Sequence, residues 1–582
     1  MEYHIVYDLT MASLTKKLIR GQAYYYAREC QRVDGKPKIV WQKYLGRLDD
    51  ILSAVEKKDQ LLSLPQPQRE GLVLDLGAVA ALYDLANRLN LASIIDRHVP
   101  KRGKGPSIGT YLLVAIINRC LDPRSKAQIG EWFDKTILRR LIDIQSHQLT
   151  SQRYWDNMDR LSAEAIGAIE SDLTVHMVKE FELDVHRLLF DATNFFTFID
   201  SFNDNSTLAQ RGKSKEGRTS LRIVGLALLV TADFHVPLLH HTYPGNQTDA
   251  PTFAGLTDLL VSRCRRLVDG VEDVTLVFDK GNNSKDNLDD IDASPYHFVG
   301  SLVPTHHQDL LQIPRSQLQS LAEEGLTTVF AYRTTKTVFG RERTVLVTYN
   351  DNLFIAQTKT LLREIAKRHQ RLRELSSNLD RWRSGQLRRG QKPTLEAIQK
   401  KVKIWLKARH MAELFTVTVT ERDGLPEVVY HFNNDAWENL QTTLLGKTLL
   451  FTDNDTWSDA EIVRAYRSQY HVEEAFRTIK SPHHISIRPQ YHWTDQKIRV
   501  HVFTCVVALM LLSLLRRELH RKGFNLSIRQ ILDCLGDIRE MTQFFIVDEG
   551  QGKPIARSSI SIATSQQKEI FQALDLDRFT AS

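Results

Sequence analysis

The pattern of apolar and polar positions predicts helices in the first third of the chain and strands after it. Residues 72–184 repeat apolar residues every three or four positions, as in GAVAALYDLANRLNLASIID, which indicates a helical domain. From residue 188 the pattern changes to short apolar runs between turn residues, which is typical of β-strands. The runs RLLFD and TLVFD are apolar enough to lie in a sheet that is covered on both faces.

Residues 305–457 interrupt this pattern. They begin with strand-like TTVFAYRTTKTVFGRERTVLVTY, continue through a basic helical region at 355–410, and return to strands in LFTVTVTERDGLPEVVYHF and GKTLLFTDND. Because a loop of about 12–15 residues is already long in a compact domain, we predict an α+β insertion. Residues 458–525 then resume the core, with helices predicted at 459–481 and at about 497–519. Residues 526–582 are predicted to be a C-terminal helical or tail region.

A basic module at residues 1–60 precedes the helices. The segments YYYAREC and KPKIVWQKYLG flank Asp34-Gly35, a turn pair that predicts a β-hairpin. The basic residues of this hairpin are Lys16, Lys17, Arg20, Arg28, Lys36, Lys38, Lys43 and Arg47. Two interpretations stay open, a DNA contact or a solvated surface. In the helical domain, QRYWDNMDRL after Thr150-Ser151 is either a recognition helix for a DNA groove or part of a bundle packed on the core.

Composition narrows the class of protein. A chain of 582 residues has room for three or four domains of about 150 residues each. Apolar residues are 42% and charged residues 25%, which argues against a disordered or fibrous chain. The five cysteines form no CxxC pair, so their spacing indicates neither a zinc site nor a disulfide framework. The start has no signal-peptide pattern, and the longest apolar run, 502–515, is shorter than the roughly 20 residues a bilayer needs. We expect a cytoplasmic protein.

Charge is informative by its distribution rather than its sum. The formal net charge of +7 is a weak argument for a polyanionic partner. Between Lys359 and Arg409, however, sixteen Lys or Arg stand against four Asp or Glu. This stretch is either a clamp for DNA phosphates or a solvated, coiled-coil-like helical hairpin.

Three carboxylates occupy positions suited to metal binding. Asp191 and Asp279 each stand at the polar end of an apolar strand, where open α/β sheets build their sites. An ionised Asp there is costly to desolvate unless something pairs with it, and a metal would do so. Glu473 lies on the predicted helix 459–481. Three carboxylates suit two Mg²⁺ ions about 3.5–4 Å apart, an arrangement that activates a nucleophile and stabilises the leaving oxygen of a phosphodiester.

The predicted helix surrounds Glu473 with phosphate-binding groups. The residues that recur every three or four positions on its face are Tyr466, Gln469 or Tyr470, Glu473, Arg477 and Lys480. The neighbouring Glu474 lies about 100° around the helix, so we favour Glu473. Ser458, with Glu461 three residues later, predicts a capping box at the start of the helix.

The string from Tyr466 to Lys480 resembles the Y-x2-R-x3-E-x6-K signature of bacterial insertion-sequence transposases, which have a DDE catalytic core and a β-rich insertion before the Glu. Gln469 stands where that family usually has Arg. Further similar segments are DATNF, GKSKEGRTSLR, PLLHHTYPGNQTDAPTF, FDKGNNS and RPQYHWTDQKIRVHVFTC, so the resemblance covers roughly residues 185–515. The intervals also fit, because 88 positions separate Asp191 from Asp279 and 194 separate Asp279 from Glu473.

The resemblance implies a ribonuclease-H-like mixed sheet with flanking helices, divided between residues 185–304 and 458–525. It implies that Asp191, Asp279 and Glu473 are catalytic and bind two Mg²⁺ ions, for which Mn²⁺ can substitute. Tyr466 and Lys480 would hold a DNA phosphate, and helix geometry adds Arg477.

The implied reaction is cleavage at the ends of a transposable element, followed by attack of the freed 3′-hydroxyl on target DNA. The implied partners are terminal inverted repeats, target DNA and a second copy of the chain in a synaptic complex. The implied location is a prokaryotic cytoplasm, on the nucleoid when DNA is bound.

Two aromatic residues and three histidines have competing interpretations. Trp437 and Trp457 either pack in the core or stack on a base extruded from DNA, a contact worth about 1–3 kcal/mol. The histidines, which we expect to make polar loop contacts rather than bind a metal because no Cys accompanies them, are His483, His484 and His492.

Two other functions would use the same features. A ribonuclease-H-like nuclease or recombinase needs the same three carboxylates but does not move an element. An inactive DNA-binding derivative is disfavoured because all three carboxylates are present.

Overall fold

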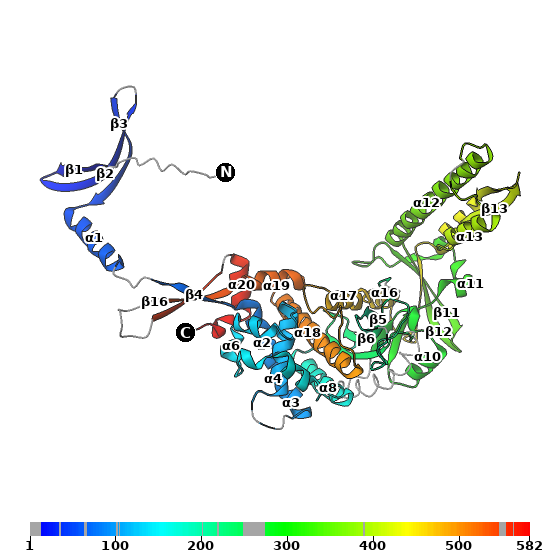
Figure 1. The fold of residues 1–582 in the computed structure, drawn as a ribbon, viewed down its shortest axis with the longest axis horizontal. Coiled ribbons are helices and arrows are strands. Elements are labelled where there is room, and N and C mark those ends of the chain that lie inside the picture. The colour runs from blue at the N-terminus through cyan, green and yellow to red at the C-terminus, as the bar shows by residue number, and fades with distance from the viewer. Residues whose placement is uncertain are drawn as a thin grey trace. The chain divides into compact units, whose positions relative to one another are not determined.

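The computed structural model contains two compact units (Figure 1). The residues that it describes are 13–33, 36–62, 67–100, 103, 105–200, 202–217, 220–247, 274–387, 390–545, 555–562 and 564–581. The smaller unit consists of Met1–Leu74, Glu540–Ser561 and Ala581–Ser582, and the larger unit of Asp75–Arg539 and Ile562–Thr580.

In the residues of the smaller unit that the structure describes there are two three-stranded sheets and one helix. In the first sheet β2 (Gln22–Val33) lies between β1 (Ser13–Ile19) and β3 (Lys36–Gly46), and α1 (Leu48–Leu62) follows. Val33 pairs with Lys36 where the sequence predicts a hairpin, while the turn residues Asp34 and Gly35 lie outside the described residues. Nearly all of β1 and β3 is exposed. The second sheet has the order β17 (Ile555–Ile560), β16 (Arg539–Phe545) and β4 (Pro67–Asp75).

A nine-stranded mixed sheet lies at the centre of the larger unit, in the order β10-β11-β12-β15-β9-β8-β5-β6-β7. The strands β5 (Arg187–Phe196), β6 (Ile223–Thr231) and β7 (Pro237–Pro244) form an antiparallel meander. On the other side of β5, β8 (Thr275–Phe278) and β9 (His297–Ser301) continue the sheet in parallel. Every residue of β8 is buried, and so are Leu188, Leu189 and Phe190 of β5, which agrees with the prediction that the runs RLLFD and TLVFD lie in a sheet covered on both faces. Every residue of β6 is buried as well.

Four strands from the predicted insertion extend this same sheet. β10 (Gln319–Ser320), β11 (Val329–Val338) and β12 (Arg341–Asn350) pair in turn, and β12 then pairs with β15 (Lys447–Thr452). β15 in turn pairs with β9. The part that leaves the sheet is therefore 351–446, which is narrower than the predicted 305–457. From the sequence alone, a strand that extends the core sheet cannot be distinguished from a strand that builds a separate sheet, because both have the same apolar pattern.

The segment outside the sheet has its own small core. Its long helix α12 (Asp351–Arg383) packs on β14 (Leu425–Phe432), and α13 (Leu395–Trp405) packs on β13 (Phe415–Arg422) and β14. The apolar stripe that α12 buries consists of Leu361, Ile365, Leu372, Leu375 and Leu379. Two short helices, α14 (Met411–Leu414) and α15 (Asn434–Asn439), flank the β13–β14 pair in the chain.

The helices predicted for residues 72–184 are present. The main ones are α2 (Gly77–Arg88), α3 (Leu91–His98), α4 (Ile108–Leu121), α7 (Ser151–Met158) and α8 (Ala163–Glu180). Of these, α2, α4 and α8 pack against one long helix, α18 (Asp495–Arg521), whereas α3 and α7 pack on α4. Figure 1 shows α2 and α4 beside α18, and these pairs are in contact. Among the described residues, α18 is the one helix long and apolar enough to cross a membrane, yet 94% of its most apolar stretch is buried within the protein. It forms a core helix, as predicted for 502–515.

The predicted helix 459–481 is divided into α16 (Asp459–Arg467) and α17 (Tyr470–Ile479). The start agrees with the prediction, because Ser458 and Glu461 form a reciprocal capping box. The break lies at Ser468, whose Oγ donates a hydrogen bond to the Ala465 carbonyl oxygen at 2.6 Å. Serine side chains compete in this way with the regular backbone bonds of a helix.

Candidate active site

Strand register places Asp191 and Asp279 side by side. Phe190 of β5 pairs with Phe278 of the parallel strand β8, so the next residue on each strand is an aspartate. Neighbouring strands lie about 4.8 Å apart, and residues at matching positions point to the same face. The two carboxylates therefore leave the sheet at the same level.

Asp191 lies in the middle of β5, not at its end as the sequence predicts. The strand continues to Phe196 because its other edge pairs with β6 along its whole length, with Asp191 opposite Leu228. On the Asp279 side, β8 ends at Phe278. The β5–β8 pairing therefore stops one residue before Asp191.

A hydrogen-bond network holds Asp279. Ser301, the last residue of β9, donates from Oγ to Oδ1 of Asp279 at 3.2 Å. The hydroxyl of Tyr466 in α16 lies 3.0 Å from Ser301 Oγ and 3.4 Å from the same Oδ1. Sequence reasoning selected Tyr466 but missed Ser301. Ser301 lies within the run FVGSLV, where no change from apolar to polar residues marks it.

Tyr466 also reports on the charge of Glu473. Burial raises the pKa of Tyr466 to about 12, and the negative charges of Asp279 and Glu473 add to the increase, while the hydrogen bond with Ser301 opposes it. The phenol therefore stays protonated at neutral pH and remains a hydrogen-bond donor. The charge of Glu473 thus acts on the Tyr466 hydroxyl, although the ligand atoms of Asp191, Asp279 and Glu473 do not all lie within 4.8 Å of one another.

The two glutamates at the start of α17 have different surroundings. Glu473 is exposed, and its side chain has no hydrogen bond or ion pair in the part of the chain that the structure describes. Glu474 instead pairs with Arg516 of α18 at 3.1 Å, from Nη1 to Oε1. This difference favours Glu473 over Glu474 as the third carboxylate beside Asp191 and Asp279.

Lys480 closes the other side of the site. Its Nζ donates to Thr193 Oγ1 at 2.8 Å and to the Asn194 carbonyl oxygen at 2.7 Å, and it lies 3.4 Å from Glu216 Oε1. Thr193 is two positions after Asp191, so both side chains lie on one face of β5. Burial lowers the pKa of Lys480, and the adjacent carboxylate of Glu216 opposes that decrease.

Arg477 and Gln469, two other positions on the predicted helix face, differ in their surroundings. Arg477 is exposed and has no ion pair among the described residues. Gln469 stands where the insertion-sequence transposase signature has Arg. Its Nε2 is buried and has no hydrogen-bond partner among the described residues. Arg467 donates from Nη1 to the Gly325 carbonyl oxygen at 3.2 Å. The adjacent Arg467 is therefore occupied elsewhere in the fold.

A cavity of about 560 Å³ opens beside this network. Lys280, Ser301 and Tyr466 line it from the sheet side. On the opposite side it is lined by α12, among others by Gln357 and Thr360. The sequence did not predict this cavity, because it depends on how α12 is placed relative to Ser301 and Tyr466, which are far from it in the chain.

The other sequence-derived candidates lie in less specific surroundings. Trp437 in α15 and Trp457, just before α16, are half-buried, and the Trp457 carbonyl oxygen accepts a hydrogen bond from Arg333 Nη1 at 2.8 Å. His492 is buried, with Nε2 at 3.1 Å from Lys126 Nζ, and burial lowers its pKa to about 3. The rings of His483 and His484 lie 6.4 Å apart. Among the described residues these three histidines do not form a group that could hold a metal.

The comparisons with known proteins bear on the same stretch of chain. The family described as "Transposase DDE domain" matches residues 191–511, more than half of the sequence, beginning at Asp191 and including Asp279 and Glu473. The chain belongs to this family. Divalent metal ions are typical of DDE transposases, and the three carboxylates of this DDE-family chain supply oxygen ligands of the kind such ions bind.

Two further comparisons add little. No curated protein matches the DDE-family chain. Among solved structures, it is similar to one titled as a cryo-EM structure of the piggyBac transposase synaptic complex with hairpin DNA, at 8% identity, with 82% of each chain covered and a TM-score of 0.34. A TM-score of this size supports no inference about the present chain.

Proposed function

We propose that this protein is a DNA transposase that binds the terminal inverted repeats of an insertion sequence, cleaves at its ends and transfers the 3′-hydroxyl ends to target DNA. The observation that carries the proposal is the pairing of Phe190 with Phe278, which makes Asp191 and Asp279 neighbours. Both aspartates and Glu473 fall inside the range that matches the family. Family membership alone does not identify the catalytic residues, and the register supplies the physical argument for them.

The proposal includes a ribonuclease-H-like core. Support comes from the part of the sheet ordered β7-β6-β5-β8-β9, which joins an antiparallel meander to two parallel strands. Helices α16, α17 and α18 contact these strands, as expected for a mixed sheet with flanking helices. The 351–446 segment lies between the strands and the Glu473 helix in the chain.

The donor set fits Mg²⁺, with Mn²⁺ as a substitute. Asp191, Asp279 and Glu473 would hold two ions, because hard divalent cations take carboxylate oxygens. When bound, such a pair activates a nucleophile on one side of a phosphodiester and stabilises the leaving oxygen on the other. Asp279 accepts hydrogen bonds from Ser301 and Tyr466. Glu473 is free of protein hydrogen bonds in the described residues and is available to a ligand.

The surrounding side chains orient the carboxylates and the DNA. Ser301 and Tyr466 fix the Asp279 carboxylate from one side. Lys480 and Arg477 would hold a phosphate near the cut, and Arg477 is the more available of the two because Lys480 already contacts three oxygens. Trp437 and Trp457 remain candidates for stacking on an extruded base.

Two exposed basic surfaces are proposed DNA contacts. One is the β2–β3 hairpin of the smaller unit with its neighbouring strand, where Lys16, Lys36 and Lys43 are exposed. The other, which we call the α12 row, consists of Lys359, Arg363 and Lys367, spaced four residues apart, exposed and without ion pairs in the described chain. Neutralisation of phosphates by such residues releases counterions and makes binding salt-dependent. We further propose that the protein acts as a homodimer on DNA, in the prokaryotic cytoplasm.

The decisive experiment is cleavage and strand transfer in vitro with DNA that flanks the coding region. A transposase yields joined products that contain the terminal repeat and target DNA in the presence of Mg²⁺. Cleavage without any joined product would instead identify a nuclease. Binding without cleavage would identify an inactive derivative. Asp191→Asn serves as the matched protein control, since it removes one charge while keeping nearly the same shape.

A further inference from the structure

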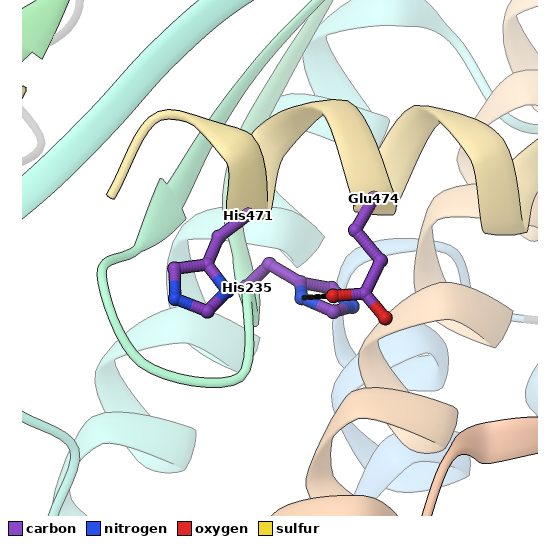
Figure 2. A group of neighbouring side chains, drawn as sticks. All are labelled: His235, His471 and Glu474. Atoms are coloured by element: carbon purple, nitrogen blue, oxygen red, sulfur yellow. Dashed lines mark ion pairs between the residues drawn. The ribbon is translucent and has the colours of Figure 1, made fainter. Parts of the chain in front are cut away.

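A second group of potential metal ligands lies on the other side of α17. His471 and Glu474 are three positions apart on this helix and therefore share a face. Figure 2 shows both side chains directed toward His235, which comes from the turn between β6 and β7. One ligand atom from each of the three residues lies within 4.8 Å of the others. In the described part of the chain this is the one such group of His, Cys, Asp or Glu side chains.

His235 is buried without a hydrogen bond. Its side chain has 0% exposure, and neither ring nitrogen has a hydrogen-bond partner among the described residues. Its nearest charged neighbour is Glu474, whose Oε2 lies 3.9 Å from Nδ1. A buried polar group without a partner costs free energy, on the order of 1–3 kcal/mol. A ligand that accepts the lone pair of the imidazole would remove that cost.

The turn that carries His235 is held in an unusual conformation. Phe234 and His235 have φ angles of 52° and 46°, a region that bulky side chains rarely adopt. Thr231 closes the turn, because its Oγ1 accepts a hydrogen bond from the Val236 amide at 3.1 Å and donates one to the Asp233 carbonyl oxygen at 2.6 Å. The fold thus fixes the imidazole against α17 instead of letting it reach solvent.

Glu474 is oriented by its other neighbour. Arg516 binds Oε1, which leaves Oε2 facing His235. Partners of this kind, which hold the second atom of a ligand, are typical of metal sites. Metals bind the neutral form of imidazole, and neither ring nitrogen of His235 has a hydrogen-bond partner in the described residues.

We propose that His235, His471 and Glu474 form a binding site for a transition-metal ion of the Zn²⁺ type, separate from the carboxylate site of Asp191, Asp279 and Glu473. Two imidazole nitrogens and one carboxylate oxygen suit Zn²⁺, whereas Mg²⁺ prefers oxygen ligands. Ligand bonds of about 2.0–2.1 Å in a tetrahedral site separate the ligand atoms by about 3.4 Å. The three side chains therefore need to move inward by about 1 Å. His471 and Glu474 are only half-buried, which permits that shift and leaves a fourth position for water.

Metal binding at this site would fix the helix that carries Glu473. The ion would join the face of α17 that carries His471 and Glu474 to the β6–β7 turn, and β6 pairs directly with β5, the strand of Asp191. Glu473 lies between the two proposed ligands of α17 in sequence, about 200° around the helix from His471 and about 100° from Glu474. The site is therefore proposed as a structural clamp. It does not depend on the proposed transposition reaction, since it concerns only the attachment of α17.

The test is a titration of the full-length protein with Co²⁺, after removal of metals by a chelator and in the presence of excess Mg²⁺. Visible d–d absorption bands are expected to saturate at one Co²⁺ per chain, and Zn²⁺ should displace the Co²⁺ and abolish them. His471→Asn and Glu474→Gln should each weaken Co²⁺ binding by about 100-fold, because loss of a ligand costs at least as much affinity as loss of a residue that only orients a ligand. Both positions are half-buried, and Glu474→Gln keeps an oxygen that can accept from Arg516, so circular dichroism should show folded variants.

Two sets of controls make the outcome unambiguous. His483→Asn removes an exposed histidine close in sequence and should leave the bands unchanged. Asp191→Asn and Glu473→Gln should also retain them, which separates this site from the carboxylate site. Absence of a saturable band in the folded wild-type protein would overturn the proposal. An unchanged affinity in folded His471→Asn and Glu474→Gln would overturn it equally.

Discussion

The hydroxyl of Tyr466 lies 3.4 Å from Oδ1 of Asp279, so the last turn of α16 contacts the candidate metal ligand that follows strand β8. Tyr466→Phe removes this hydrogen bond and the one to Ser301 while keeping the ring. We expect cleavage of terminal-repeat DNA to slow by about 10–100-fold, as for other groups that orient a metal ligand. Single-turnover cleavage measures the effect. A rate equal to that of the wild type would show that Tyr466 does not orient Asp279.

The same tyrosine predicts a pH dependence of stability. Its pKa is about 12 in the folded protein and close to 10 in the unfolded chain. The folded state therefore holds the proton more tightly, and its contribution is complete below pH 10 and is lost as the pH rises toward 12. The thermal stability of the wild-type protein should fall more steeply than that of Tyr466→Phe between pH 10 and 12. Parallel curves would contradict the raised pKa.

Loss of any one of the three carboxylates should abolish cleavage but not DNA binding. Asp191→Asn, Asp279→Asn and Glu473→Gln each remove a charge with little change in volume. We expect the cleavage rate to fall by more than about 100-fold, because about 100-fold is already the largest loss typical of residues that only orient a metal ligand. Binding to the terminal DNA should still be measurable by gel shift. Asp289→Asn, an exposed carboxylate paired with Lys285, is the matched control and should cleave normally. Full cleavage by a triad variant in Mg²⁺ would refute the assignment.

Lys480 and Arg477 should behave differently in a stability assay. Lys480→Ala removes the hydrogen bonds to Thr193 Oγ1 and the Asn194 carbonyl oxygen, while Glu216 keeps Arg488 at 3.2 Å, and should lower the free energy of unfolding by about 1–3 kcal/mol. Arg477→Ala should change it by less than about 0.5 kcal/mol, as for other exposed positions. Both changes should reduce DNA cleavage. Denaturant titration and cleavage assays on the same preparations separate the two roles, and an equal loss of stability in both would contradict the structure.

The α12 row should determine part of the salt dependence of DNA binding. Replacing Lys359, Arg363 and Lys367 by Ala should reduce the slope of log K against log salt by up to about 0.9 for each DNA phosphate that the variant no longer neutralises. A triple control uses exposed cations that already have acidic partners, namely Arg124, Lys135 and Lys285. An unchanged slope in the α12 variant would favour a solvated helical hairpin.

Local features of the site could be predicted from the sequence, because they depend on neighbouring residues. The capping box at Ser458, the burial of the apolar runs in β5 and β8 and the core helix α18 each follow from a short pattern. The register of Phe190 with Phe278 does not, because it joins segments 88 residues apart and depends on the whole sheet. The break at Ser468 was also missed, since a serine within an amphipathic pattern does not by itself end a helix.

The group around His235 shows a different limit of sequence reasoning. His471 and Glu474 have a recognisable spacing on one helix, but His235 is far from both in the chain. Its turn, ADFHVP, has neither glycine nor asparagine to indicate backbone conformations with positive φ. Cysteine spacing carries no information about a site built from His and Glu.

The pairing of Tyr349 with Lys447 has a consequence for the segment between them. Antiparallel partners have Cα atoms about 4.5–5.5 Å apart, so the chain leaves the sheet and returns to it within one strand spacing. In topological terms, residues 351–446 are one very long loop joining two adjacent strands. Such a loop can be lengthened, shortened or exchanged for a tight turn without altering the order of the strands. The neighbouring aspartates on β5 and at the end of β8 thus belong to a framework whose connectivity is independent of what the loop contains.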